Sequence, residues 1–421
     1  MTHPVASPSV AAKSPSVATK TDSVWAEAPG RLDFLGGVAD YSGSLVLETP
    51  IRAVTRVELA PLAEPVARLV SATETEVFQI SLDLIQSFLP ESPAAWRAKL
   101  LAASAPKWAL YPLGCLLFFA RTQAWWPAGG LEFRVHSGVP TSMGVSSSAA
   151  LEVATMRALV LLSGQTFEGT ALARLAQRVE NEVVGAPCGL MDQLSTNHGT
   201  PGALLPILCR PDKLGEVIPL PEGVVIVGWP SGVKHAVTDS PYATARTAAF
   251  MGKRILEDYF DRKLDFLTEL TPSQVRPLDE SVLPHFVSGA EFLDRFGALE
   301  DILSTVDPDR LYPVREGALS PVEENYRCTV ASALLRQGHE EDLRLVGELL
   351  YQSHASYTRI GLGCPETDDM IEAVRALGPE NGFYGARVSG GGSGGTVVVL
   401  ARASAVERLK SLDGFPGTLI F

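Results

Sequence analysis

Residues 140–150 read Pro-Thr-Ser-Met-Gly-Val-Ser-Ser-Ser-Ala-Ala and are followed by an apolar helical pattern over residues 151–162. The loop therefore lies at the amino end of a helix, where N–H groups lack intrahelical partners and the dipole adds roughly half a positive charge. Small side chains let a polyphosphate approach this backbone, and the hydroxyls of Ser146, Ser147 and Ser148 can bond phosphate oxygens or ligate Mg²⁺. The stretch predicts a phosphate site; a serine-rich N-cap on a buried helix is the alternative.

Length and composition limit the classes of protein to consider. At 421 residues, and with about 150 residues per domain as a guide, the chain is expected to form two or three domains. Its 46% hydrophobic and 20% charged residues are typical of a globular protein. The net charge of −13 argues against nucleic acid or an anionic membrane as partner, but not against a nucleotide.

The cysteines and the first residues indicate the compartment. Five cysteines, widely spaced and without a Cys-x-x-Cys pair, favour reduced thiols in a cytoplasmic protein over a disulfide framework or a zinc site. Residues 1–22 mix Ser, Ala, Pro, Thr and Lys without the apolar core of a signal peptide, so we expect a disordered tail. No apolar run reaches the roughly 18 residues of a membrane span.

Charged residues stand out in two small-residue segments. Residues 25–51 predict strand, turn and strand, with Arg31 after a Pro-Gly turn and Asp40 between two turns. Taken alone, they are compatible with a surface ion pair and a turn residue. A helix is predicted over residues 167–182, with Glu180 near its end. Asp192 then follows two glycines and could simply be a helix N-cap.

Farther along the chain, residues 231–254 predict a loop and a helix that carries Tyr242 and Arg246. A helix is also predicted over residues 343–357, with His354 at its exposed end as a surface or packing residue.

Residues 390–395 match both the dinucleotide motif G-x-G-x-x-G and the nucleophile elbow G-x-S-x-G. Both motifs need a helix directly after the glycines, and a β-branched strand pattern follows instead, so neither is expected to apply. The sequence has no Walker A motif.

Four segments in this order resemble the small-molecule kinases of the GHMP superfamily, most closely the galactokinase branch: residues 29–41, 140–150, 185–193 and 389–395. The resemblance implies an α+β, two-domain GHMP kinase fold with the active site between the domains. An N-terminal domain like ribosomal protein S5 would span residues 23–205, and a ferredoxin-like C-terminal domain residues 206–421. ATP and Mg²⁺ would be the cofactors. The partners would be a small-molecule sugar and ATP, without nucleic acid or membrane, and the protein would be a monomer or simple homodimer.

The resemblance also implies roles for individual residues. Asp192 would be the base facing the anomeric hydroxyl, with Arg31 beside it, and Ser148 and Glu180 would hold Mg²⁺. The remaining positions fall into three groups: Ser142, Met143, Gly144, Val145, Ser146, Ser147 and Ser148 would bind ATP; Gly37, Val38, Asp40, Gly189 and Tyr242 would bind the sugar; Gly390, Gly391, Gly392 and Gly394 would close the site. The residue types suit phosphoryl transfer, which depends on in-line positioning and on neutralising charge on the phosphoryl oxygens.

Two residue pairs depart from the galactokinase pattern. Gly37-Val38 replaces the usual Glu-His, which is associated with the C6 hydroxymethyl end of the sugar. A primary hydroxyl left there without a partner would cost about 1–3 kcal/mol. L-Arabinopyranose has the ring stereochemistry of D-galactopyranose without that group, and residues 28–47 resemble the kinase half of plant-type L-arabinokinases. We therefore expect an L-arabinose 1-kinase, with galactokinase and then a non-catalytic sugar sensor as alternatives. Changing Gly37→Glu together with Val38→His is expected to raise galactose activity.

The second departure is in the phosphate loop, where Ser142-Met143 stands at the place at which the family loop usually begins with glycine.

Overall fold

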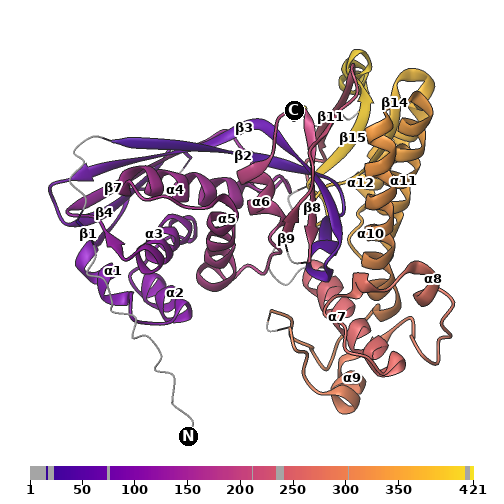
Figure 1. Cartoon of the computed structure of the whole chain (residues 1–421), viewed down its shortest axis with the longest axis horizontal. Coiled ribbons are helices and arrows are strands. Elements are labelled where there is room, and N and C mark those ends of the chain that lie inside the picture. The colour runs from indigo at the N-terminus through magenta and orange to yellow at the C-terminus, as the bar shows by residue number, and fades with distance from the viewer. Residues whose placement is uncertain are drawn as a thin grey trace, which may run out of the picture.

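The first half of the chain is built on one large sheet. The computed structural model describes residues 16–17, 23–73, 76–210, 212–233, 241–301, 303–412 and 418–421. The sheet has eight strands in the order β10-β8-β3-β7-β4-β5, with β2 paired to β3 and β9 to β8 (Figure 1). Its strands are β2 (Val24–Leu35), β3 (Leu45–Leu62), β4 (Val66–Ser71), β5 (Phe78–Ser81), β7 (Gly130–Ser137), β8 (Ala203–Cys209), β9 (Asp212–Leu214) and β10 (Ile218–Pro219).

Six helices cover one face of this sheet (Figure 1). They are α1 (Leu82–Phe88), α2 (Pro93–Ala102), α3 (Leu110–Gln123), α4 (Ser147–Ser163), α5 (Gly169–Arg178) and α6 (Met191–His198). Leu59 and Phe133 of the sheet form one core with Leu117 of α3 and Met156 of α4. The apolar helical pattern that follows the small-residue loop is therefore the buried face of α4, which fixes the loop at its amino end.

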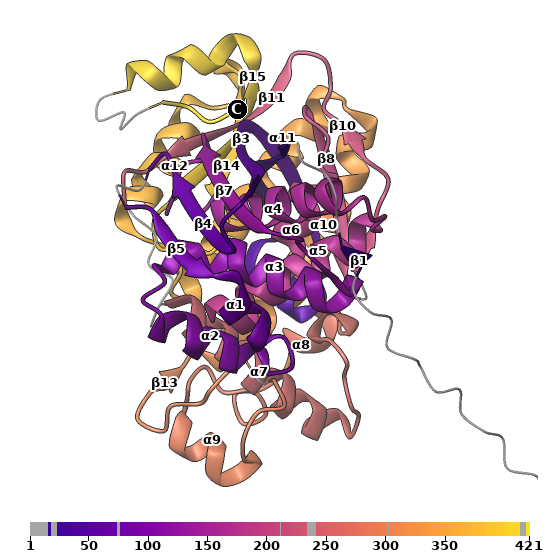
Figure 2. The ribbon, with the colours of Figure 1, turned by 90° about the vertical axis from the view of Figure 1, so that its left-hand side faces the viewer.

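A second, smaller sheet organises the other half. Strands β11 (Val224–Pro230), β15 (Thr396–Arg402) and β14 (Phe383–Val388) form an antiparallel sheet in that order. Helices α10 (Val314–Gln337), α11 (Glu340–Arg359) and α12 (Pro365–Leu377) stand beside it, and α7 (Pro241–Phe260), α8 (Pro272–Val275) and α9 (Gly289–Phe296) form a group at one end (Figures 1 and 2). The short strands β12 (Val287–Ser288) and β13 (Leu311–Tyr312) pair within that group.

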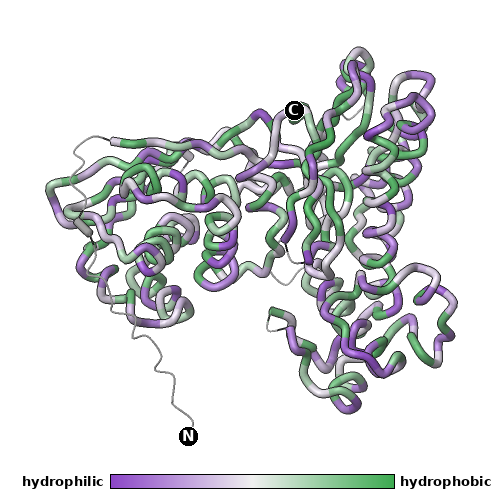
Figure 3. The backbone as a smooth tube through the Cα atoms, viewed as in Figure 1, coloured by the Kyte–Doolittle hydropathy of each residue, from purple (hydrophilic) through white to green (hydrophobic). Residues whose placement is uncertain are grey.

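One hydrophobic core crosses from the first half to the second. Leu32 and Leu47 of the large sheet pack with Val346 and Leu350 of α11 and with Val398 of β15. Strand β15 is mostly green in Figure 3, as expected for a strand buried on both faces. The expected α+β architecture is confirmed, and the two halves share buried surface instead of meeting only through a linker.

The division between the halves comes later than expected. A boundary after residue 205 would cut β8, which pairs with β3 in the large sheet. Because β9 and β10 complete the same sheet, the topology places the change between Pro219 and Val224. Of the expected tail, the structure describes only β1 (Ser16–Val17), which pairs in parallel with β6 (Trp125–Trp126). Within the described ranges, no helix combines the length and the apolar character needed to cross a bilayer.

Candidate active site

A cavity of about 340 Å³ lies where the loop before α4, the turn after β2, the segment before α6 and the glycine loop before β15 meet. Of the residues predicted for the site, it is lined by Arg31, Val38, Asp40, Ser142, Gly144, Val145, Ser146, Ser147, Ser148, Glu180, Gly189, Asp192, Tyr242, Gly390 and Gly391. Segments that lie more than 350 positions apart in the chain therefore form one concave site, the usual form of a small-molecule site.

The loop before α4 has the backbone of an anion-binding nest. Ser142, Gly144 and Ser146 have φ values of 59°, 70° and 56°, whereas the residues between them do not have positive φ. Such alternation turns successive N–H groups toward one concave side. The side chain of Ser146 caps nothing, and its Oγ is buried without a hydrogen-bond partner. Ser146 therefore occupies the N-cap position of α4, as the alternative interpretation expected, but its side chain does not do the work of an ordinary serine cap.

Arg31 links this loop to Asp192. Its Nη1 donates to the carbonyl of Gly144 at 2.7 Å, while Nε and Nη2 donate to Oδ1 of Asp192 at 3.0 and 2.6 Å. Within the described part of the chain, no hydrogen bond reaches Oδ2 of Asp192, and this side chain is 20% exposed. Arg31 itself is only 3% exposed, so it is not a surface ion pair. One oxygen of the Asp192 carboxylate is thus fixed, and the other is free to accept a proton.

Asp192 is not a helix N-cap. Helix α6 begins at Met191 with Leu190 in the capping position, and Asp192 lies in its first turn. A second carboxylate also approaches Arg31, because Oε2 of Glu48 is 3.2 Å from Arg31 Nε. Glu48 is fully buried, and burial together with Asp33 raises the pKa of this carboxyl well above its usual range.

Asp40 and its neighbours form the other end of the cavity. Asp40 lies in a 3-10 helix, Gly37–Ser42, and its Oδ1 accepts a hydrogen bond from the Tyr41 amide at 2.7 Å. Burial and the charge of Asp192 raise the pKa of Asp40 to about 7, against the opposing effect of Arg246. Tyr242 contacts the ring of Tyr41 edge to face, with centroids 6.1 Å apart. A side chain on Gly189 would collide with Asp40, since its Cβ would lie 1.6 Å from Oδ2. Asp40 is thus both a turn residue and a wall of the cavity.

Glu180 and Ser148 lie together in the cavity wall. Glu180 belongs to a π-helical segment, Val179–Val184, that continues α5. Its carboxylate accepts hydrogen bonds from Nε2 of Gln193 at 2.9 Å and from Sγ of Cys188 at 3.6 Å, and the nearby Ser148 hydroxyl acts to lower its pKa. Burial and the charge of Asp192 raise the pKa of Glu180 to about 7. A carboxylate and a hydroxyl are oxygen ligands of the kind that Mg²⁺ uses, and Mg²⁺ in phosphotransfer sites takes only one or two protein carboxylates with substrate phosphates. The pair fits that role, and the described residues contain no cluster of three or more His, Cys, Asp or Glu that would form a closed metal site.

Four predicted residues do not line the cavity. Met143 packs against the core shared by the two halves. Gly37 faces the hydroxyl of Tyr357, Gly392 faces Leu362, and Gly394 faces Val233. The glycine loop still adjoins the nest, because Thr396 Oγ1 donates to the carbonyl of Met143 at 2.8 Å. As expected, it leads into a strand and not into a helix.

The sequence interpretation missed or misplaced other residues. Lys107, Tyr111, Thr141 and Cys188 also line the cavity. The helix end that carries His354 is not exposed: of the two expected roles, surface or packing, His354 has the packing one, and its Nε2 lies 2.8 Å from Oδ1 of Asp368 on α12. Lys234 and His235, which lie in the loop predicted at the start of residues 231–254, are outside the described residues. The five cysteines are free thiols.

Comparison with known proteins gives the same class of fold. Residues 111–200 match the GHMP kinases N-terminal domain and residues 330–411 match the GHMP kinases C-terminal domain. The chain therefore contains both domains of the GHMP kinases and has their two-domain fold. L-Arabinokinase of Arabidopsis thaliana is 32% identical over an alignment that covers 92% of this chain, and the chain spans only 43% of that relative.

Solved structures with this fold include two kinases. Galactokinase of Lactococcus lactis in complex with galactose superposes with a TM-score of 0.74 at 22% identity, covering 93% of this chain and 88% of the galactokinase. Mevalonate kinase of Methanococcus jannaschii has a TM-score of 0.59 at 14% identity, covering 95% and 98% of the two chains. The domain order, sheets and connecting helices described above are thus a known kinase architecture.

Proposed function

We propose that this protein is a sugar 1-kinase, which transfers the γ-phosphoryl group of ATP to the anomeric hydroxyl of a monosaccharide, L-arabinose before D-galactose. The observation that carries the proposal is that Arg31 hydrogen-bonds both to Asp192 and to the carbonyl of Gly144 in one cavity. A proton acceptor and a polyphosphate cradle are thereby held at a fixed separation, which is the requirement for in-line phosphoryl transfer.

Each group in the cavity then has a chemical task. Oδ2 of Asp192 takes the proton of the attacking hydroxyl, and Arg31 balances the carboxylate charge. The amides of the nest hold the triphosphate, with Ser146 Oγ as an unused donor. Glu180 and Ser148 would hold Mg²⁺, which neutralises phosphate charge when bound. Asp40 and Tyr242 are available for the sugar hydroxyls at the other end.

The sugar is proposed from the wall around Val38. Val38 lines the cavity and is backed by an apolar cluster that includes Ala245, Ile360, Leu362 and Val388, so at this point the wall offers the sugar no side-chain hydrogen-bond partner. A uronate would need a cation in that place, and a buried hydroxymethyl group would need a hydrogen-bond partner. L-Arabinose needs neither. The identity to L-arabinokinase supports the same choice, and the five free cysteines support a reducing compartment, which we take to be the cytoplasm.

The test is an ATP-consumption panel over free pentoses and hexoses with the purified full chain and Mg²⁺. The expected result is the highest kcat/KM with L-arabinose and a value about 10- to 100-fold lower with D-galactose. A higher kcat/KM for galactose would replace the arabinose assignment with galactokinase. Saturable sugar binding without ATP consumption would instead indicate a sugar sensor, which the joint presence of Arg31, Asp192, Ser148 and Glu180 in the cavity disfavours.

A further inference from the structure

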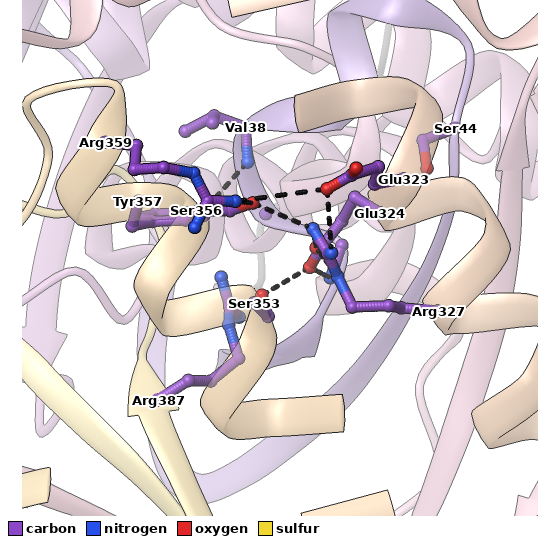
Figure 4. A network of polar contacts seen from close by, with 12 residues as sticks. Val38, Ser44, Glu323, Glu324, Arg327, Ser353, Ser356, Tyr357, Arg359 and Arg387 are labelled. Carbon is purple, nitrogen blue, oxygen red and sulfur yellow. Dashed lines mark hydrogen bonds and ion pairs between the residues drawn. The ribbon is translucent and has the colours of Figure 1, made fainter. Parts of the chain in front are cut away.

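The hydroxyl of Tyr357 joins two segments that line the cavity. Tyr357 lies on α11, and only 2% of it is exposed. Its Oη accepts a hydrogen bond from the Val38 amide at 2.9 Å, drawn in Figure 4, and donates one to the carbonyl of Gly390 at 2.9 Å. Burial raises the pKa of Tyr357 well above its usual range, so the hydroxyl keeps the proton that it donates.

The same hydroxyl fills the space that a side chain on residue 37 would need. A Cβ on Gly37 would lie 1.7 Å from Tyr357 Oη and 2.8 Å from Asp33 Oδ2, and Gly37 has a φ of +47°. The Gly37→Glu and Val38→His exchange expected to raise galactose activity therefore cannot be made while Tyr357 stays in place. A side chain at position 37 and the hydroxyl of Tyr357 thus compete for one space, although the two positions lie 320 apart in the sequence.

Tyr357 is held rigidly in this position. Oε1 of Glu324 on α10 accepts hydrogen bonds from the Gly36 amide at 3.1 Å and from Ser353 Oγ at 2.6 Å. Arg327 donates to Oε2 of Glu324 at 2.7 Å and to Ser356, the residue before Tyr357, at 3.1 Å (Figure 4). The turn that carries Val38 is thereby bonded to the same network as the helix that carries Tyr357, and neither can shift alone.

We propose that Tyr357 is a specificity-determining residue: by filling the space beside Gly37 and fixing Val38, it gives the cavity an apolar wall that favours a pentopyranose over its hydroxymethyl-bearing counterpart. This inference rests on the proposed function, because Val38 can face the sugar ring only if the acceptor hydroxyl meets Asp192. A hydroxymethyl group packed against Val38 would lose its hydrogen bonds to water without gaining others. Because the Val38 amide is bonded to Tyr357, Val38 cannot move aside to make room for that group.

The first test is Tyr357→Phe, which keeps the ring in its apolar contacts and releases Val38 and Gly390. We expect kcat/KM for L-arabinose to fall about tenfold, a smaller change for D-galactose, and an ATP KM within about twofold of the wild type. The matched control is Tyr312→Phe. Tyr312 is also 2% exposed, and its hydroxyl accepts the Asp307 amide at 2.8 Å outside the cavity. It should lower the Tm without changing the ratio of the two sugars.

A second pair of variants tests the contact with residue 37. Gly37→Ala should lower the Tm more in the wild-type chain than in the Tyr357→Leu chain, because the leucine removes the hydroxyl that the new Cβ would strike. An unchanged arabinose-to-galactose ratio in Tyr357→Phe, or equal Tm losses in the two backgrounds, would overturn this inference and leave the sugar kinase standing. A wild-type chain that phosphorylates neither sugar would overturn the proposed function, and this inference with it.

Discussion

Arg31 donates two hydrogen bonds to a single carboxylate oxygen of Asp192, 161 positions later in the chain. Its third nitrogen bonds the carbonyl of Gly144, and its own backbone amide bonds the carbonyl of Val145 at 3.1 Å. The position of the proposed base relative to the phosphate loop is therefore set by one side chain. Replacing either member of the pair should affect phosphoryl transfer more than nucleotide binding.

Asp192→Asn should retain ATP binding and lose most turnover. The amide keeps an oxygen for Arg31 but cannot take the proton of the attacking hydroxyl, so kcat should fall about 10²- to 10⁴-fold. Calorimetric titration with an ATP analogue and steady-state kinetics measure the two effects separately. The control Asp83→Asn changes an exposed carboxylate in the first turn of α1 and should leave both unchanged. Near-normal kcat in Asp192→Asn would refute the assigned base.

Arg31→Lys should be far from conservative. Lysine keeps the charge but has no planar fork, so it cannot bond Asp192 and Gly144 together in the present geometry. We expect kcat to fall about 10²-fold, with a smaller change in the ATP dissociation constant. Arg174→Lys, which alters a half-exposed pair with Asp212, is the comparison. If Arg31→Lys raised only the KM for ATP, the guanidinium would be a phosphate ligand and not a positioning group.

The Mg²⁺ concentration that the enzyme needs should depend on pH through the protonation of Glu180. Burial and Asp192 raise the pKa of this carboxyl to about 7 in the metal-free protein, so protons compete with the metal below that pH. The Mg²⁺ concentration for half-maximal rate should therefore rise up to about tenfold per unit as the pH falls below 7. Glu180→Asp should keep a pH-dependent response, and Glu180→Gln should need much more Mg²⁺ at every pH. A requirement that is flat from pH 6 to pH 8 in the wild type would exclude Glu180 as a ligand.

Asp40→Asn should stabilise the substrate-free protein, and more so at pH 8 than at pH 5. Burial raises the pKa of Asp40 from an unfolded value near 3.9 to about 7, so the folded state binds this proton more tightly. The free energy of unfolding then decreases as the pH rises between these values, by about 1.4 kcal/mol per unit of pKa shift at most. Asparagine does not titrate and can still accept from the Tyr41 amide.

Urea denaturation at the two pH values measures the difference. The exposed Asp309 serves as the control, because Asp309→Asn should have the same small effect at both. An equal gain at pH 5 and pH 8 would show that packing, and not the proton, limits the stability at Asp40. Loss of sugar turnover in the stabilised variant is expected, since the carboxylate is proposed to bind a sugar hydroxyl.

Local patterns in the sequence predicted much of the site but not its long-range contacts. The small-residue loop, the helix after it and the strand after residues 390–395 follow from periodicity and residue size, and the structure has all three. The contact of Tyr357 with Val38 and that of Asp33 with Arg387 could not be predicted, because each joins residues more than 300 positions apart. One signal was available: Asp33 and Glu48 are acids inside apolar strand patterns, which indicates a buried charge partner.

Two errors have the same physical origin. His354 was placed on an exposed helix end because the pattern of one helix does not reveal that α12 covers it. The boundary after residue 205 was set too early because an apolar strand such as β8 carries no information on which sheet it joins. Both depend on tertiary packing, which periodicity does not encode.

The ion pair between Asp33 and Arg387 joins positions 354 apart, and neither side chain is exposed. During translation, β2 with Asp33 is synthesised early, whereas Arg387, the cation that pairs with this buried acid, is synthesised only near the end of the chain. Polypeptides that stall on the ribosome before residue 387 carry this charge without its counterpart, and should be recognised by proteases and chaperones as unfinished.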